Sequence, residues 1–116
     1  LVEQIVAPYG VHAQVDYQRG VPPVVNDVES IVHLGDAVER VLGPGGEVPT
    51  LQSLGGEDFG WYLDRVPGAM GRLGTRTPGG PTYDLHQGNL RVDDRATGIG
   101  AKLLATVAVG SLVTER

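Results

Sequence analysis

The 116-residue sequence contains no cysteine, which excludes a disulfide framework and any thiolate metal site within this chain. Aromatic residues make up only 5%, and the nine lysine and arginine residues are dispersed. With a formal net charge of -5 and no basic cluster, nucleic acid is not expected as a partner. The sequence opens without a signal-peptide pattern, and its apolar stretch 99–113 contains Lys102 and is too short to span a bilayer. We therefore expect a soluble cytoplasmic protein with no membrane role.

The composition is that of a globular protein, with 41% apolar residues and 18 glycines. This balance is typical of a loop-rich α/β segment. The first residues, Leu-Val-Glu-Gln-Ile-Val, are typical of the interior of a helix. We therefore expect that the start of the protein lies upstream of this chain.

Apolar spacing and turn residues predict six elements. In order, they are a helix over 1–7, a strand over 11–19, a helix over 26–42, a helix over 57–65, a strand over 69–73 and a helix that begins after Asp93. The strand over 11–19 alternates apolar and polar residues, which indicates one buried face. The Pro22-Pro23 pair that follows is the best candidate for a domain boundary. This order of elements favours an α/β layer.

The two long helices have recognisable ends. Asn26 followed by Glu29 has the form of a helix start, and Gly43 ends that helix. Asp93 is the predicted cap of the last helix. The apolar positions of this last helix cover most of its surface and predict deep burial; they are Ala96, Ile99, Leu103, Leu104, Val107, Ala108 and Val109.

His86 is the histidine with the best chance of binding a ligand. It follows a glycine-rich loop and precedes a capped helix, and binding residues collect on such loops. A metal site needs three or four donors, however, and a lone loop histidine is more often only solvated. Asp84 is an orienting partner for the ring or an ordinary solvated carboxylate. His12 and His33 lie on polar faces and are expected to be solvated.

A second candidate site is the segment Gly55-Gly56-Glu57 with the following Asp58-Phe59. Paired glycines form a tight turn or let a ligand approach the backbone, and acidic residues suit the first turn of a helix without any further function. Asn26 is interpreted first as a helix cap. No phosphate-binding glycine fingerprint and no Gly-x-Ser-x-Gly motif is present.

Four motifs occur in a specific order along the chain. They are Tyr17-Gln18-Arg19-Gly20-Val21-Pro22-Pro23-Val24-Val25-Asn26-Asp27, Ser53-Leu54-Gly55-Gly56-Glu57-Asp58-Phe59, Val66-Pro67-Gly68-Ala69 and Tyr83-Asp84-Leu85-His86-Gln87-Gly88. Together they resemble the C-terminal part of the metal-dependent amidohydrolases of the aminoacylase and carboxypeptidase superfamily, which includes hippurate hydrolase and the auxin-conjugate hydrolases. After His86 the sequence departs from the family pattern, because Gly88 and Leu90-Arg91 stand where a proline and an aromatic–aspartate pair are common.

The resemblance implies an α/β catalytic domain of the phosphorylase/hydrolase-like kind, into which an α+β lid used for dimerisation is inserted. Residues 1–25 would then be the last helix and strand of the lid and the return hinge. Residues 26–116 would be the C-terminal part of the catalytic domain. The boundary at the proline pair agrees with this division.

The resemblance also assigns roles to residues. His86 matches the last metal ligand, and Gly55, Gly56, Glu57 and Asn26 match positions near the metal and the substrate. A complete enzyme would hold a divalent metal, in the form of two zinc or manganese ions, and a metal-activated water would attack the amide of an N-acyl amino acid or short peptide. The general-base glutamate and the other ligands would lie upstream, so this chain has no catalytic residue and is expected to be inactive alone.

Two alternatives stay open. The same scaffold also serves peptidases and carbamoylases. A different class is a non-catalytic interaction module that pairs through its exposed strand over 11–19.

Overall fold

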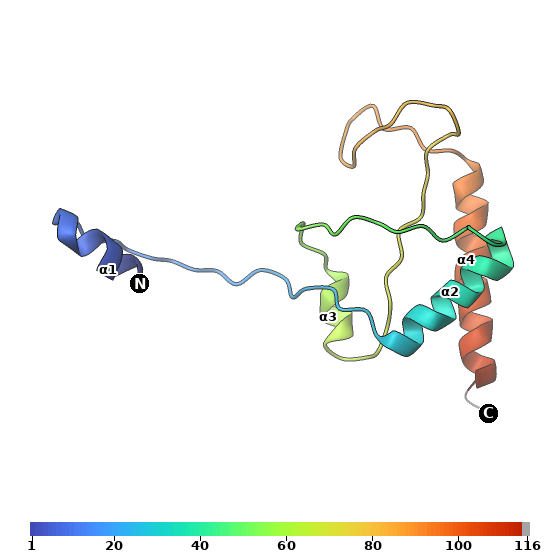
Figure 1. Cartoon of the computed structure of the whole chain (residues 1–116), viewed down its shortest axis with the longest axis horizontal. Coiled ribbons are helices and arrows are strands. Elements are labelled where there is room, and N and C mark those ends of the chain that lie inside the picture. The colour runs from blue at the N-terminus through green and yellow to red at the C-terminus, as the bar shows by residue number, and fades with distance from the viewer. Residues whose placement is uncertain (115–116) are drawn as a thin grey trace.

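The computed structural model describes residues 1–114, and the elements of this part are all helical (Figure 1). They are α1 (Val2–Val6), the 3-10 helix η1 (Ala7–Tyr9), α2 (Val28–Leu42), α3 (Phe59–Leu63) and α4 (Arg95–Thr114). The predicted N-terminal helix is confirmed as α1, and η1, which follows it directly, ends at Gly10 with a left-handed φ of 69°. The third predicted helix is shorter than expected, because only five residues form α3.

Helix α2 confirms the predicted helix, but with a different cap. The Asp27 carboxylate, not the Asn26 side chain, accepts the Ser30 backbone N–H at 2.9 Å. The Ser30 hydroxyl donates to the same carboxylate oxygen at 2.9 Å. These bonds satisfy a donor that the first turn of a helix otherwise leaves unpaired. Gly43 ends the helix as predicted, with a φ of 79° that suits a residue without a Cβ.

Helix α4 packs against α2, and this pair is the largest contact between helices in the described part of the chain. Ala37 of α2 and Ala96 of α4 are the buried apolar side chains among the described residues, at 3% and 6% exposure. Ile99, Leu103 and Val107 are half-buried, so the predicted apolar stripe is the less exposed side of α4. On the α2 side, Ala37 lies beside the part of α4 that contains Thr106, Val107 and Gly110.

The predicted deep burial of α4 is wrong for this chain. Leu104 and Val109, which widen the stripe, are 72% and 62% exposed. The physical reason is that α2 covers only one side of a helix whose apolar residues extend around it. The rest of its apolar surface therefore has no cover within residues 1–114.

One described helix, over Arg95–Val113, is long and apolar enough to cross a membrane by length and composition, with a mean hydropathy of 1.6. The apolar stretch predicted over 99–113 is thus part of a longer helix, and the prediction that it is too short to span a bilayer does not hold for the whole helix. The same composition is found in core helices of larger folds.

The segments predicted as strands, over 11–19 and 69–73, have no ladder partner among residues 1–114. A strand is defined by the hydrogen bonds that it exchanges with a neighbour, and an isolated strand is not stable. The described residues therefore form helices and loops, and the α/β layer remains a prediction for a larger fold.

The described chain is extended. Its radius of gyration is 20.5 Å and its longest extent is 64 Å, whereas a compact chain of this length has a radius of gyration of roughly 13 Å. Figure 1 shows α1 at the end of a long stretch without helix, far from the α2–α4 pair. Many large apolar side chains are exposed, including Leu51 at 88% and Leu54 at 98%. These side chains lack the cover that a complete core provides.

Candidate functional site

Asn26 uses both ends of its side-chain amide on one distant residue. Its Oδ1 accepts the Met70 backbone N–H at 2.9 Å, and its Nδ2 donates to the Met70 carbonyl oxygen at 3.3 Å. Next to it, the Asp27 backbone N–H donates to the Gly68 carbonyl oxygen at 2.9 Å. The side chain thus takes the place that a neighbouring strand would have beside Met70. The expected role of Asn26 as a helix cap is wrong, because Asp27 has that role.

Four residues before Asn26, the backbone of Pro22 lies directly against α3. A Cβ added to Gly60 would lie 2.5 Å from the Pro22 carbonyl oxygen, which is closer than a real Cβ approaches any oxygen. Gly60 is also buried. Gly60 is not among the residues predicted from the sequence to form a site, although a glycine inside a short helix between Phe59 and Trp61 is a signal of close packing.

The Gly55-Gly56-Glu57 segment forms an exposed turn before α3. The Gly55 N–H donates to the Ser53 hydroxyl at 3.1 Å, and the Glu57 carbonyl oxygen accepts the Gly60 N–H at 3.1 Å. Neither Gly55 nor Gly56 has a positive φ, so the pair is not needed for a left-handed backbone. The close neighbour at Gly56 is Val21, whose Cγ2 would lie 3.0 Å from an added Cβ. Within this chain, close approach at Gly56 therefore involves the segment that leads to Asn26.

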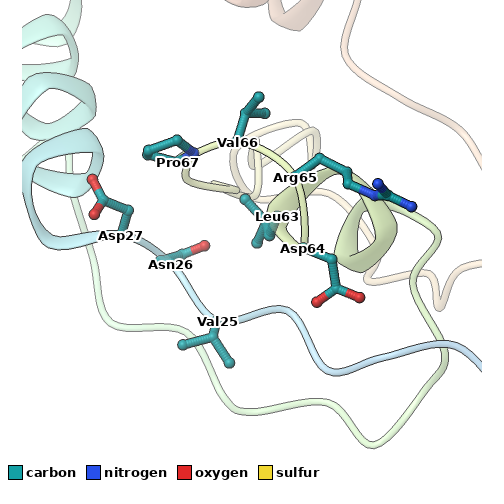
Figure 2. A pocket seen from close by; sticks show the side chains of 9 residues that line it. Val25, Asn26, Asp27, Leu63, Asp64, Arg65, Val66 and Pro67 are labelled. Atoms are coloured by element: carbon teal, nitrogen blue, oxygen red, sulfur yellow. The ribbon is translucent and has the colours of Figure 1, made fainter.

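A surface hollow of about 480 Å³ lies between residues 25–27 and residues 63–68 (Figure 2). Asn26 and Asp27 line it, but their side chains are engaged with Met70 and Ser30. The charged groups of Asp64 and Arg65 point away from the Asn26 side chain in Figure 2. The hollow therefore lacks the convergent polar groups that define a ligand site.

His86 lies in the loop over 75–93, which we call the His86 loop. It is exposed and has a φ of 68°, and among residues 1–114 it is the non-glycine residue with a positive φ. This backbone conformation is uncommon for a residue with a Cβ, although histidine adopts it more often than most. Nearby, the Asp84 backbone N–H donates to the Gln87 side chain at 3.3 Å. The local turn thus fixes the backbone around His86.

Asp93 closes the base of the His86 loop. Its backbone N–H donates to the Thr75 carbonyl oxygen at 2.8 Å, and its carboxylate accepts the Arg95 backbone N–H at 3.0 Å. The Arg95 guanidinium donates to both carboxylate oxygens, at 2.8 and 2.6 Å. These hydrogen bonds, the side-chain bond from Arg95 first, lower the pKa of Asp93 to about 2. In turn, Asp93 raises the pKa of Arg95.

The structure brings some of the predicted site residues together and leaves His86 apart. Asn26 and Gly56 both belong to the contacts around residues 21–27. The His86 loop lies at the N-terminal end of α4, separated from α3 in Figure 1. Within the described residues, no group of three or more histidine and acidic side chains could hold a metal ion. The donors of residues 1–114 thus do not make a metal site by themselves, and His86 is a single donor.

Residues 2–109 match the peptidase family M20/M25/M40, and the chain belongs to this family. A hydrolase of Synechocystis is 36% identical over 93% of the chain and 28% of its own length. The N-acetylcysteine deacetylase of Bacillus subtilis is 32% identical over 98% of the chain and 28% of its own length. A Rhodococcus jostii protein named as a glutamate–cysteine ligase is 45% identical over 89% of the chain and 13% of its own length.

The chain thus spans between about an eighth and a little over a quarter of the curated relatives that it matches. No solved structure matches the chain. The comparisons thus show that this chain is similar to one segment of the members of the peptidase family M20/M25/M40.

Proposed function

We propose that this chain is the C-terminal part of a hydrolase that cleaves the amide bond of N-acyl amino acids. The observation that supports this most is the family match over residues 2–109. The deacetylase relative is named for an N-acyl amino acid, and the four ordered motifs resemble the hippurate and auxin-conjugate hydrolases. Short peptides are the related substrates on the same scaffold.

In this proposal the complete fold is α/β. Residues 1–25 end a lid that forms a homodimer, and residues 26–116 belong to the catalytic domain, with residues 115–116 outside the described part of the chain. The exposed apolar side of α4 supports the proposal, because a core helix of a larger domain is apolar around most of its surface. We also propose that the complete protein is cytoplasmic and has neither a membrane nor a nucleic-acid partner.

His86 is proposed as one ligand of a divalent metal, zinc or manganese, in a site of two ions. Since members of this family are generally metal-dependent, the other ligands and the general base would come from residues outside this segment. Gly55, Gly56 and Glu57 would line the substrate side of that site. The chain alone is therefore expected to hydrolyse nothing, because residues 1–114 contain no cluster of metal donors.

One observation favours a second candidate. The Rhodococcus jostii relative carries a similar segment in 13% of its length and is named for ligation rather than hydrolysis. A segment that covers so little of a protein says little about the chemistry of the rest. The alternative is a non-catalytic interaction module within a longer protein, and a peptidase or carbamoylase is the alternative within the hydrolase class.

The test is a substrate panel for the purified protein that contains this segment. N-acetyl, N-benzoyl and N-carbamoyl amino acids and dipeptides are each incubated with added zinc or manganese, and release of the free amino acid is measured. We expect release from N-acyl amino acids, and none from the 116-residue chain under the same conditions. No release from any substrate, together with condensation of glutamate and cysteine, would favour the module instead.

A further inference from the structure

The segment that leads into α2 is held at several points along its length. We call residues 20–26 the hinge segment, after the role that the family resemblance gives it. Val21 lies against Gly56, Pro22 lies against Gly60, and Asn26 is bonded to Met70. A flexible connection would have none of these contacts, since loops run over the surface with few bonds to the body.

The chemistry of Asn26 suits a backbone partner. A peptide group presents one N–H donor and one carbonyl acceptor, and a side-chain amide presents the complementary acceptor and donor. The contact joins residues 44 positions apart in sequence, so it fixes tertiary structure and not a local turn. Both functional ends of the amide are used in this way.

Gly60 contributes to this contact because it has no Cβ. Its backbone is helical, where alanine is intrinsically favoured over glycine, and its φ is not positive. The close approach of the Pro22 carbonyl is therefore the feature that an added Cβ would disturb. Gly98 of α4 is a natural comparison, because an added Cβ there would have nothing within 4 Å.

We propose that Asn26 and Gly60 are positioning residues that fix the hinge segment across α3 and Met70. They thereby set the direction in which the chain over 1–19 leaves the part that begins at Asp27. The interpretation of residues 1–19 as part of a lid rests on the proposed function. The contacts of the hinge segment do not depend on that function. In this proposal Asn26 acts on the Met70 backbone and not on the substrate.

The first experiment measures amide hydrogen exchange by NMR in the ¹⁵N-labelled 116-residue chain. Asn26→Leu removes both hydrogen bonds, and we expect the protection of the Met70 amide to fall by about tenfold. Asn26→Asp keeps the acceptor for the Met70 N–H but loses the donor to its carbonyl oxygen, so its protection should be intermediate. Asn89→Leu changes the other asparagine of the chain, which is exposed, and should leave Met70 unchanged.

The second experiment compares two glycines and reads the direction of the hinge segment. Because the chain has no cysteine, Gln18→Cys and Glu39→Cys introduce two unique spin-label sites at exposed positions. We expect the distance distribution between the labels to broaden in Gly60→Ala and in Asn26→Leu. It should keep its width in Gly98→Ala and Asn89→Leu. The far-UV circular dichroism signal of α2 and α4 verifies that each variant keeps its helices.

The proposal is overturned if the Met70 protection of Asn26→Leu stays within twofold of the unchanged chain. It is also overturned if the label distribution has the same width in all four variants. If Gly60→Ala loses its helical signal, the Asn26→Leu and Asn26→Asp variants test the proposal in its place. None of these measurements uses a substrate, so a protein that fails the hydrolysis panel and still shows the Asn26 effects would refute the proposed function alone.

Discussion

The hinge segment and the His86 loop both contain residues that the sequence singled out, yet they are held in different ways. The hinge segment is joined to residues far along the chain, through Met70, Gly60 and Gly56. The His86 loop is closed at its base by Asp93, and the other hydrogen bonds described within it join residues three to six positions apart. One region therefore has its tertiary neighbours within this chain, and the other has mainly local ones.

This difference separates two kinds of candidate residue. Asn26 has a complete set of partners here, so its position can be explained from this chain alone. His86 is exposed on a backbone of uncommon φ, and such conformations are found at functional sites when surrounding structure stabilises them. If His86 is a ligand, the groups that complete its surroundings come from elsewhere in a longer protein.

The largest expected effect is the loss of activity when His86 is replaced. If activity were kept, the His86 loop would no longer differ from the hinge segment by having a ligand that is completed from outside this chain. In the complete protein, His86→Ala should lower kcat/KM for N-acyl amino acids by at least about a hundredfold, since even residues that only support a metal ligand can cost that much. His12→Ala is the matched control, because His12 is exposed in the N-terminal segment, and it should retain most of the activity. Unchanged hydrolysis by His86→Ala would contradict the assignment of the ligand.

A smaller effect is expected where the hinge segment meets α2. Asp27→Ala removes the acceptor of the Ser30 backbone N–H, and the protection of that amide from exchange should fall by roughly fivefold, as for the loss of a helix cap. Asp27→Asn keeps a side-chain acceptor and should stay close to the unchanged chain. Equal exchange in the alanine and asparagine variants would show that the cap does not stabilise the first turn.

The smallest effect is a pH dependence at the base of the His86 loop. The pKa of Asp93 is lowered from 3.8 to about 2 in the folded chain, so its contribution to stability is complete above pH 3.8 and is lost as the pH falls towards 2. An NMR titration of the Arg95 amide should follow this loss. Because the Arg95 side chain is 69% exposed, 0.5 M salt should weaken the ion pair. A midpoint near 3.8 would contradict the shift.

The helices of this protein were largely predictable from sequence. Apolar spacing and Gly43 defined α2, and the stripe through Ala96, Ile99 and Leu103 identified the less exposed side of α4. These signals are local, because helical hydrogen bonds join residues four apart. The cap of α2 was assigned one residue too early, since Asn26 and Asp27 are both good caps and only the contact with Met70 decides between them.

The candidate site was less predictable. Spacing along the chain cannot show that Asn26 meets Met70 or that Gly60 meets Pro22, because these contacts join residues about 40 positions apart. Nor does any local pattern indicate which side chains surround His86. The strands predicted over 11–19 and 69–73 share this limit, because a strand needs partners that sequence periodicity does not name.

The sequence by itself determined the long helices, the absence of thiolate chemistry and the order of motifs that points to the family. It determined these because each depends on residue type and short-range spacing. Tertiary structure alone decided that Asn26 binds a backbone instead of capping a helix, that Gly60 is needed for close packing, and that most of α4 is exposed in this chain. Each of these depends on which distant surface is present, and burial follows from contact between surfaces, not from the hydrophobicity of one of them.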